Sequence, residues 1–162
     1  DYNMLVLMGE MRGDHTYFEK ADEVSKGKCS KALRMLGRHH FYKNEFEKSI
    51  EYYGRALKIN KLYPDIWFAK GCAHMRMEDY KNAIFSFSQV ISIDMRHVEA
   101  WANIASCYIV TKKFFEAVTC CEQALKCNRR AWKIWANYII FAIDTLQFYK
   151  AVHGINTLLY YD

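Results

Sequence analysis

Residues 64–97 read PDIWFAKGCAHMRMEDYKNAIFSFSQVISIDMRH, and the pattern of large and small side chains in this stretch recurs every 34 residues along the chain. One column of the pattern holds large residues, namely Leu33, Trp67, Trp101 and Trp135. Further columns hold mainly small residues: Gly37, Gly71, Ala105 and Ile139; Ser49, Ala83, Ala117 and Ala151; Ala56, Val90, Ala124 and Leu158. No insertion shifts the phase, so the sequence predicts an internal repeat.

The spacing inside each unit predicts two helices. If Pro64 is position 1, positions 4, 7, 8 and 11 share one face of a first helix, and positions 20, 24 and 27 share one face of a second. The segment between the two helices is short, so they must run antiparallel. The 162 residues include one proline and seven glycines, which also favours helix. We therefore expect an all-α fold built from antiparallel helix pairs.

The same periodicity predicts the domain organisation. Full units are expected at residues 30–63, 64–97 and 98–131, and an atypical C-terminal unit at 132–162, where bulky Ile139 stands at the small position 8. Residues 1–29 are interpreted as a degenerate or capping helical repeat, because Gly9 lies 28 residues before Gly37 instead of 34.

Composition and motifs exclude several classes of function. The net charge of +5 is too small to indicate nucleic-acid binding by itself. No apolar run reaches the roughly 18 residues of a membrane span, so no membrane partner is expected. The six cysteines lack CxxC pairs and histidines at metal spacing, which predicts no metal site and packing roles in a reducing compartment, cytoplasmic or nuclear.

Enzymatic chemistry has no support in the sequence. The six histidines fall at unrelated repeat positions, no glycine-rich loop follows a strand, and no nucleophile stands beside a base in a known motif. We expect no enzyme activity, no catalytic residues and no cofactor. Because the first residue is Asp1, the chain is expected to be a piece of a longer protein.

The order of residue classes resembles the tetratricopeptide repeat, whose signature is a large residue at position 4, Gly or Ala at 8, and Ala at 20 and 27. The resemblance covers Ser30 to Asp162. It implies a right-handed solenoid whose first helices line a concave groove, and an interaction scaffold for proteins. The stretches ALKCN (124–128), WANY (135–138), WFAKGCA (67–73) and EDY (78–80) are similar to the tetratricopeptide repeat protein 27 family, which implies a larger intracellular parent and no enzyme activity.

In this type of repeat, positions 2, 5, 9 and 12 of each first helix face the groove. The candidate partner-binding residues are Lys31, Arg34, Arg38, Phe41, Phe68, Cys72 and Met75. They form a basic end and an aromatic, Met-lined centre, which suits an extended peptide or a helix with apolar side chains. The far end is aliphatic, with Ile109, Ile140 and Ile143. These three residues either bind the ligand or pack against the remainder of a longer parent chain.

Two alternative functions remain. Some tetratricopeptide proteins hold chaperone C-termini in a carboxylate clamp, and Arg34 and Arg38 could open one, but Ala69 and Glu99 break it. A co-chaperone adaptor is therefore an alternative only. Basic residues gather between Lys26 and Lys58, and again at Lys126, Arg129, Arg130 and Lys133, which suits an RNA-processing assembly scaffold. Charges on helical repeats mostly face solvent, so nucleic acid is not the expected partner.

Overall fold

The computed structural model describes residues 1–161, with side chains described through Tyr160. Every element in this range is a helix, which confirms the all-α prediction. The helices are α1 (Tyr2–Arg12), α2 (Thr16–Val24), α3 (Ser30–Tyr42), α4 (Phe46–Ile59), α5 (Pro64–Arg76), α6 (Tyr80–Ile93), α7 (Val98–Val110), α8 (Phe114–Cys127), α9 (Trp132–Asp144) and α10 (Phe148–Tyr161). The chain divides into two compact units, residues 1–86 and 87–162, each of which is described by itself.

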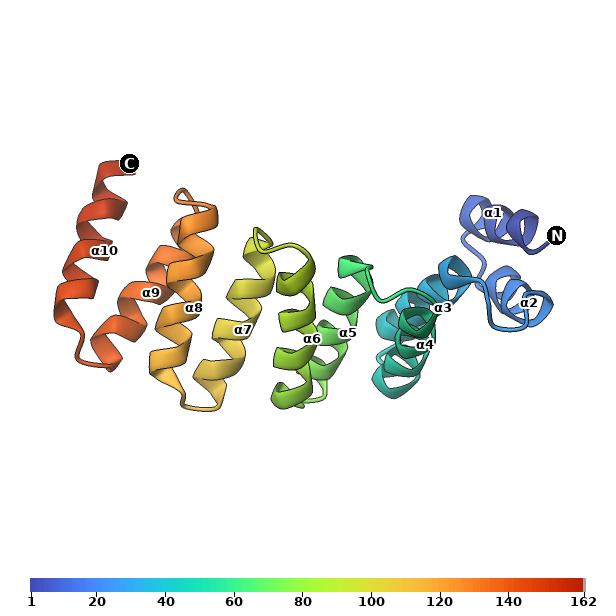
Figure 1. Ribbon diagram of the computed structural model, residues 1–162, viewed down its shortest axis with the longest axis horizontal. Coiled ribbons are helices and arrows are strands. Elements are labelled where there is room, and N and C mark those ends of the chain that lie inside the picture. Colours follow the sequence, from blue (N-terminus) through green and yellow to red (C-terminus); the bar gives the residue numbers. More distant parts are fainter. Residues whose placement is uncertain (162) are drawn as a thin grey trace. The chain divides into compact units, whose positions relative to one another are not determined.

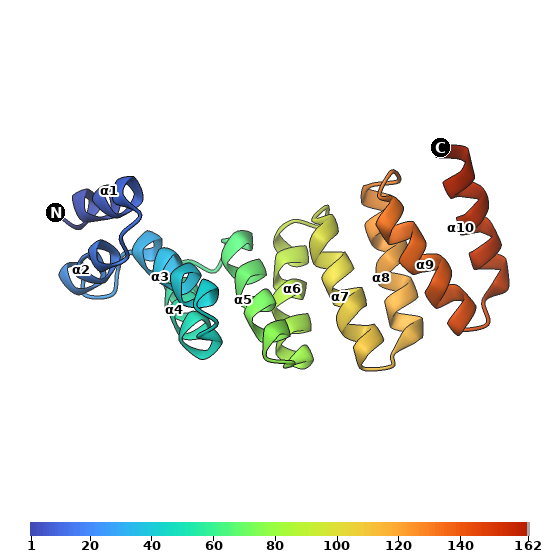
Figure 2. The ribbon, with the colours of Figure 1, turned by 180° about the vertical axis from the view of Figure 1, so that it is seen from behind.

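The first unit contains α1 to α5 and the start of α6. Figure 1 shows α4 in front of α3, and Figure 2, from behind, shows α3 in front of α4, so the pair forms two layers. One core joins α1, α2 and α3 through Val6, Phe18, Ala21, Cys29, Ala32 and Leu36. A second joins α3, α4 and α5 through Leu33, Tyr53, Ala56, Leu57 and Ile66. The helix pair α1–α2 is thus packed onto the repeats by the same kind of apolar contact.

Small residues let the paired helices approach closely, as the spacing predicts. A Cβ atom added at Gly37 would lie 2.6 Å from Cε1 of Tyr53, so only a glycine leaves room for this ring. The Ser49 hydroxyl donates a hydrogen bond of 2.8 Å to the Gly37 carbonyl oxygen, which ties α4 to α3 at the same level. Tyr53 is thereby held beside Gly37, among residues of α3, α4 and α5.

The second unit contains the end of α6 and helices α7 to α10. Figure 1 shows α8 in front of α9, and Figure 2 shows α9 in front of α8. Its buried side chains include Ile104, Ala105, Cys107, Ala117, Val118, Cys121, Ala124, Trp135 and Tyr138. Burial raises the pKa of the Cys121 thiol to about 12, so this cysteine is a neutral packing residue at neutral pH.

The last helix pair reverses the usual order of large and small residues. Ile139 occupies the position where Gly37 stands in α3, and Gly154 in α10 lies opposite it. A Cβ atom at Gly154 would come within 2.7 Å of the Ile139 side chain. The glycine has therefore moved to the other helix, which explains how a bulky residue fits at position 8 of the atypical unit.

In the four helix pairs from α3 to α10, the turn between the helices has a left-handed residue at the same position. Four such residues, 34 positions apart, have φ between 58° and 61°, namely Asn44, Glu78, Lys112 and Leu146. The residue after each of them donates a hydrogen bond to the carbonyl five residues earlier, as Glu45 does to His40. This closes the preceding helix in a Schellman motif, a conformation that usually selects glycine. None of the four is a glycine, and only Asn44 is a residue type that commonly adopts this conformation, so glycine does not mark these turns.

The loops before the first helices also repeat. The indole nitrogens of Trp67, Trp101 and Trp135 donate hydrogen bonds of 2.8, 3.0 and 2.8 Å to a carbonyl oxygen six residues earlier in the chain. The tryptophan at position 4 therefore packs between helices and also holds, by this hydrogen bond, the loop that precedes its own helix.

Candidate functional site

A cavity in the first unit lies between α3 and α5 and has a volume of about 280 Å³. Its lining residues are Arg38, Phe41, Tyr42, Tyr53, Phe68, Ala69 and Cys72. Four of them, Arg38, Phe41, Phe68 and Cys72, were predicted as groove residues from their repeat positions. The two first helices thus bring the predicted aromatic centre together in one hollow.

The other predicted residues lie elsewhere. Lys31 donates a hydrogen bond of 2.9 Å to Glu10, and Arg34 donates one of 2.7 Å to Asp65. Both cations border a smaller cavity of about 180 Å³ near Tyr63. Met75 is half-buried on α5 and does not line the larger cavity. The expected basic end is therefore largely neutralised by carboxylates from α1 and from the first turn of α5.

Arg38 is the cation that remains at the larger cavity. Its guanidinium lies 5.6 Å from the centre of the Tyr42 ring, a cation–π contact, and it forms no ion pair with a carboxylate in residues 1–160. The Phe41 ring packs edge-on against Tyr42 at a centroid distance of 6.0 Å. An arginine held against aromatic rings combines an apolar wall with one positive charge.

The remaining polar groups of the cavity are neutral. Burial raises the pKa of Tyr53 to about 12, so its hydroxyl stays protonated at neutral pH. Burial also raises the pKa of the Cys72 thiol, which keeps the sulfur neutral and a poor nucleophile. The cavity can therefore accept an apolar side chain beside an anionic group, and it lacks an activated nucleophile among its lining residues.

Sequence reasoning missed Tyr42, Tyr53 and Ala69. Tyr42 follows Arg38 by four residues, the spacing at which side chains on a helix meet, so this signal was available. Tyr53 stands at position 24 of its unit, in the second helix, whereas only positions of the first helices are expected to face the groove. It reaches the cavity only because Gly37 leaves room for the ring beneath α3.

Two histidines of the first unit pair with a carboxylate in the turn that follows their helix. His40 lies 2.7 Å from Glu45, and His74, one repeat later, lies 3.1 Å from Asp79. Each pair joins the end of a first helix to the turn after it. Within the described residues, no group of three or more His, Cys, Asp or Glu side chains could hold a metal ion. In the same part of the chain, each helix is too short or too polar to cross a membrane.

Comparisons with known proteins agree with this fold. Tetratricopeptide repeat models match residues 30–63, 64–96 and 98–130. Over 72 residues the chain is 35% identical to the tetratricopeptide repeat protein 27 homolog of Dictyostelium discoideum, which confirms the predicted resemblance. This match covers 44% of the chain but only 8% of that relative.

Solved structures share the architecture. MamA superimposes with a TM-score of 0.85 at 13% identity, covering 99% of this chain and 89% of its own. YrrB, a TPR protein described as having an unusual peptide-binding site, gives 0.79 at 15% identity, covering 99% and 82%. At such identities these likenesses establish the fold alone. Because the repeat models match more than half of the 162 residues, the chain belongs to the tetratricopeptide repeat family.

Proposed function

We propose that the chain is a protein–protein interaction scaffold that binds a peptide or helix along its first helices, as part of a larger protein of the cytoplasm or nucleus. The observation that supports this most directly is the meeting of Arg38, Phe41, Phe68 and Cys72 around one cavity. We assign the repeats to 30–63, 64–97, 98–131 and 132–162, with 1–29 as a capping pair.

The cavity favours a particular kind of ligand. Its walls are mainly aromatic, so an aliphatic or aromatic side chain can enter it and lose contact with water. Arg38 stands at the cavity without a carboxylate partner among the described residues, so an acidic residue next to the apolar one would pair with it. We expect peptides with an apolar residue next to Asp or Glu to bind best.

The test is a selection of random phage-displayed peptides on the 162-residue chain, followed by fluorescence anisotropy of the enriched peptides. Phe68→Glu should weaken binding roughly tenfold or more, because it removes an aromatic wall and adds a repelling charge. Phe115→Glu is the matched control, since Phe115 lies on the exposed face of α8. It should leave binding unchanged.

Arg38→Glu supplies a second, independent variant that retains the aromatic wall. It should weaken acidic peptides more than their amide counterparts. Circular dichroism establishes that each variant remains folded. If no peptide is enriched, or if enriched peptides bind the folded Phe68→Glu and Arg38→Glu variants as well as the original chain, the groove is not the recognition site.

The two alternative functions gain little from the site. A chaperone clamp would need Arg34 for a carboxylate ligand, but Arg34 already pairs with Asp65. An RNA scaffold would predict binding that falls steeply with salt and is lost on neutralising Arg129 and Arg130.

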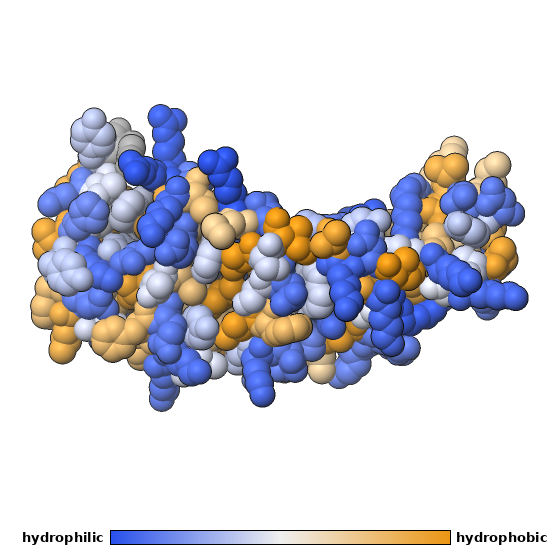
Figure 3. Space-filling view, viewed as in Figure 1, coloured by the Kyte–Doolittle hydropathy of each residue, from blue (hydrophilic) through white to orange (hydrophobic). Residues whose placement is uncertain are grey.

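A second surface supports the proposed packing against a longer parent chain. On α10, Val152, Ile155 and Leu159 are 56%, 43% and 67% exposed. Figure 3 shows hydrophobic patches on the surface in the region of α10. One repeat earlier, the equivalent residues of α8, which packs against both α7 and α9, are 1%, 1% and 5% exposed; these residues are Val118, Cys121 and Leu125. We therefore propose that a further helix of the parent packs on α10 as α9 packs on α8.

Hydrogen exchange on the longer natural protein tests this second proposal. Amides of α10 should exchange more slowly there than in the 162-residue chain, and Leu159→Asp should abolish the difference. Equal exchange rates in both proteins would contradict the proposal. Tyr149→Asp, on the same helix but outside this apolar row, is the control.

A further inference from the structure

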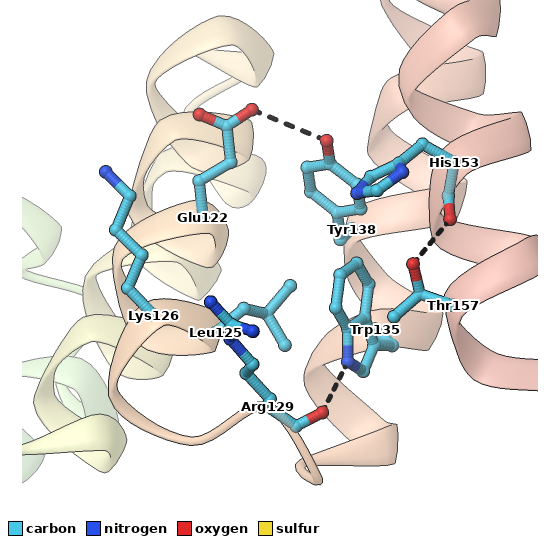
Figure 4. Close-up of a pocket in the computed structure, with 8 residues that line it drawn as sticks. All are labelled: Glu122, Leu125, Lys126, Arg129, Trp135, Tyr138, His153 and Thr157. Carbon is cyan, nitrogen blue, oxygen red and sulfur yellow. Dashed lines mark hydrogen bonds between the residues drawn. The ribbon is translucent and has the colours of Figure 1, made fainter. Parts of the chain in front are cut away.

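A second cavity, of about 460 Å³, lies in the second unit among α8, α9 and α10 (Figure 4). Its lining residues are Glu122, Leu125, Lys126, Arg129, Trp135, Tyr138, His153 and Thr157. Figure 4 shows the α8 residues on one wall, His153 and Thr157 of α10 on the opposite wall, and the two aromatic rings of α9 between them. None of these residues belongs to the groove of the first unit.

The aromatic rings at the base of this cavity are held by contacts with their neighbours. The Trp135 indole nitrogen donates a hydrogen bond of 2.8 Å to the Arg129 carbonyl oxygen. Its ring contacts Tyr138 edge-on at 5.6 Å and His153 at 6.3 Å between centroids. Trp135 is 8% exposed and Tyr138 is 4% exposed. The rings therefore provide an apolar base, while their faces are too covered to stack on a planar ligand.

The one carboxylate of the cavity is already neutralised. Glu122 accepts a hydrogen bond of 2.8 Å from the Lys150 ammonium and one of 3.4 Å from the Tyr138 hydroxyl. Burial, together with the neighbouring Glu122 charge, raises the pKa of Tyr138 to about 12, so this hydroxyl remains a donor at neutral pH. Figure 4 shows the Glu122 carboxylate directed towards Tyr138, away from Arg129.

The two cations of the same wall remain uncompensated. Lys126 and Arg129 form no ion pair with any carboxylate in residues 1–160. Figure 4 shows the Arg129 guanidinium beside Leu125, facing Trp135 across the cavity. With Glu122 balanced by Lys150, these side chains give the lining a positive charge in contact with an apolar surface.

The cations are not a requirement of the repeat. One repeat earlier, the residues equivalent to Lys126 and Arg129 are Ser92 and Met95, in the same unit. The Trp101 indole there makes the same loop hydrogen bond, to the Met95 carbonyl at 3.0 Å. The fold is thus satisfied without charge at these positions, and the charge at the α8–α10 cavity is available for a ligand.

We propose that this cavity is a second binding site, which takes an acidic side chain of a partner polypeptide together with an adjacent apolar residue. The carboxylate pairs with the Arg129 fork and with Lys126, and the apolar residue packs on Leu125 and the edge of Trp135. A polyanion such as RNA fits less well, because Glu122 stands on the same wall and the buried rings offer no stacking surface.

Nuclear magnetic resonance of the ¹⁵N-labelled 162-residue chain tests the proposal through its tryptophan indole signals. The probe is the capped peptide acetyl-Leu-Glu-Leu-amide, with acetyl-Leu-Gln-Leu-amide as its neutral match. The acidic peptide should shift the Trp135 signal in a saturable way. Trp101, which makes the same hydrogen bond elsewhere in the second unit, should respond less and serves as the internal reference.

Two neighbouring arginines provide the matched variants. Arg129→Gln should weaken the response of Trp135 at least about fivefold, since it removes a charged fork while leaving the backbone carbonyl that holds the indole. Arg130→Gln, next in the chain but outside the lining, should change it little. Retained signals of Trp67 and Trp101 establish that each variant is folded.

Three outcomes would overturn the proposal. The first is no saturable shift of Trp135. The second is an equal shift with the neutral peptide, which would mean simple apolar contact. The third is stronger binding of an oligouridylate that is lost equally with Arg129→Gln and Arg130→Gln, which would make the cavity part of an RNA-binding surface.

Discussion

The pairs α7–α8 and α9–α10 have the same helix lengths and the same turn, yet their second helices differ in burial. Val118 of α8 is 1% exposed and Val152, its equivalent in α10, is 56% exposed. The side chains are identical and so is their position in the repeat. The difference comes from the neighbour, because α9 packs against α8 while the described residues provide no such helix for α10. A repeat sequence thus specifies a face that needs covering, and the adjoining repeat covers it.

The largest expected effect on stability comes from placing a charge at either of the two equivalent valines, Val118 and Val152. Val118→Asp should lower the free energy of unfolding of the 162-residue chain by about 4 kcal/mol, because it buries an unpaired charge. Val152→Asp should change it by less than about 0.5 kcal/mol, because solvent already reaches that side chain. Urea denaturation followed by circular dichroism measures both. Equal losses would mean that α10 is covered in solution.

The second prediction concerns the exchange of large and small residues. Gly154→Ala should lower the free energy of unfolding by about 1–3 kcal/mol, since the new methyl group meets Ile139. The double variant Ile139→Ala, Gly154→Ala should recover part of this loss, because it restores the arrangement of α7–α8, where Ala105 stands at the small position. A double-mutant cycle measures the coupling. Additive effects would show that the two residues do not compensate each other.

The third prediction replaces the left-handed residue by glycine in both the α7–α8 and the α9–α10 turn. Lys112 and Leu146 have φ of 59° and 58°, a conformation that costs a residue with a Cβ atom free energy. Lys112→Gly and Leu146→Gly should each raise the free energy of unfolding by about 0.5–1 kcal/mol. Asn44→Gly is the control and should gain less, because asparagine tolerates this conformation. Thermal unfolding is the measurement, and a lower Tm for either glycine variant would contradict the explanation.

The smallest expected effect is on the pH dependence of stability and concerns His74, near the end of α5. Burial lowers the pKa of His74 below its usual value, so the folded state disfavours the charged imidazole. Its contribution to stability is complete above the unfolded pKa near 6.5 and is lost as the pH falls below it. His74→Tyr copies Tyr108 of the next repeat and should reduce the loss of stability between pH 7 and pH 5.

Urea denaturation at both pH values measures this change, with His97→Gln as a control at a histidine outside the turn. The Asp79 pKa is also lowered, chiefly by hydrogen bonds from Asn82, so its contribution disappears only at more acidic pH. An unchanged pH dependence in His74→Tyr would assign the acid sensitivity to other groups.

The helices could be predicted from the sequence because helical periodicity is a local property. The repeat predicts position 1 of each unit at Ser30, Pro64, Val98 and Trp132, and α3, α5, α7 and α9 begin at these residues. The short turns between paired helices were predicted as well, but the left-handed residue in each turn and the tryptophan hydrogen bonds to the loops were not. A left-handed residue is recognised in sequence by glycine, and none of the four turns has one.

The lining of the cavity between α3 and α5 could be predicted in part for the same reason. Positions on one face of α3 and α5 follow from the repeat, so Arg38, Phe41, Phe68 and Cys72 were found. Tyr53 was missed because it reaches the cavity from α4, through space that Gly37 leaves open. A second helix contributes to such a surface only when a small residue on the first admits it.

By itself, the sequence determined the 34-residue period, the antiparallel helix pairs and the residues that share one face of each first helix. All three follow from side-chain spacing along a single chain. Only the tertiary structure decided which charges remain available. Lys31 and Arg34 are paired by Glu10 and Asp65, whereas Arg38 keeps no carboxylate partner among the described residues. An ion pair depends on the distance between two helices, and that distance is set by packing, which no spacing within one helix encodes.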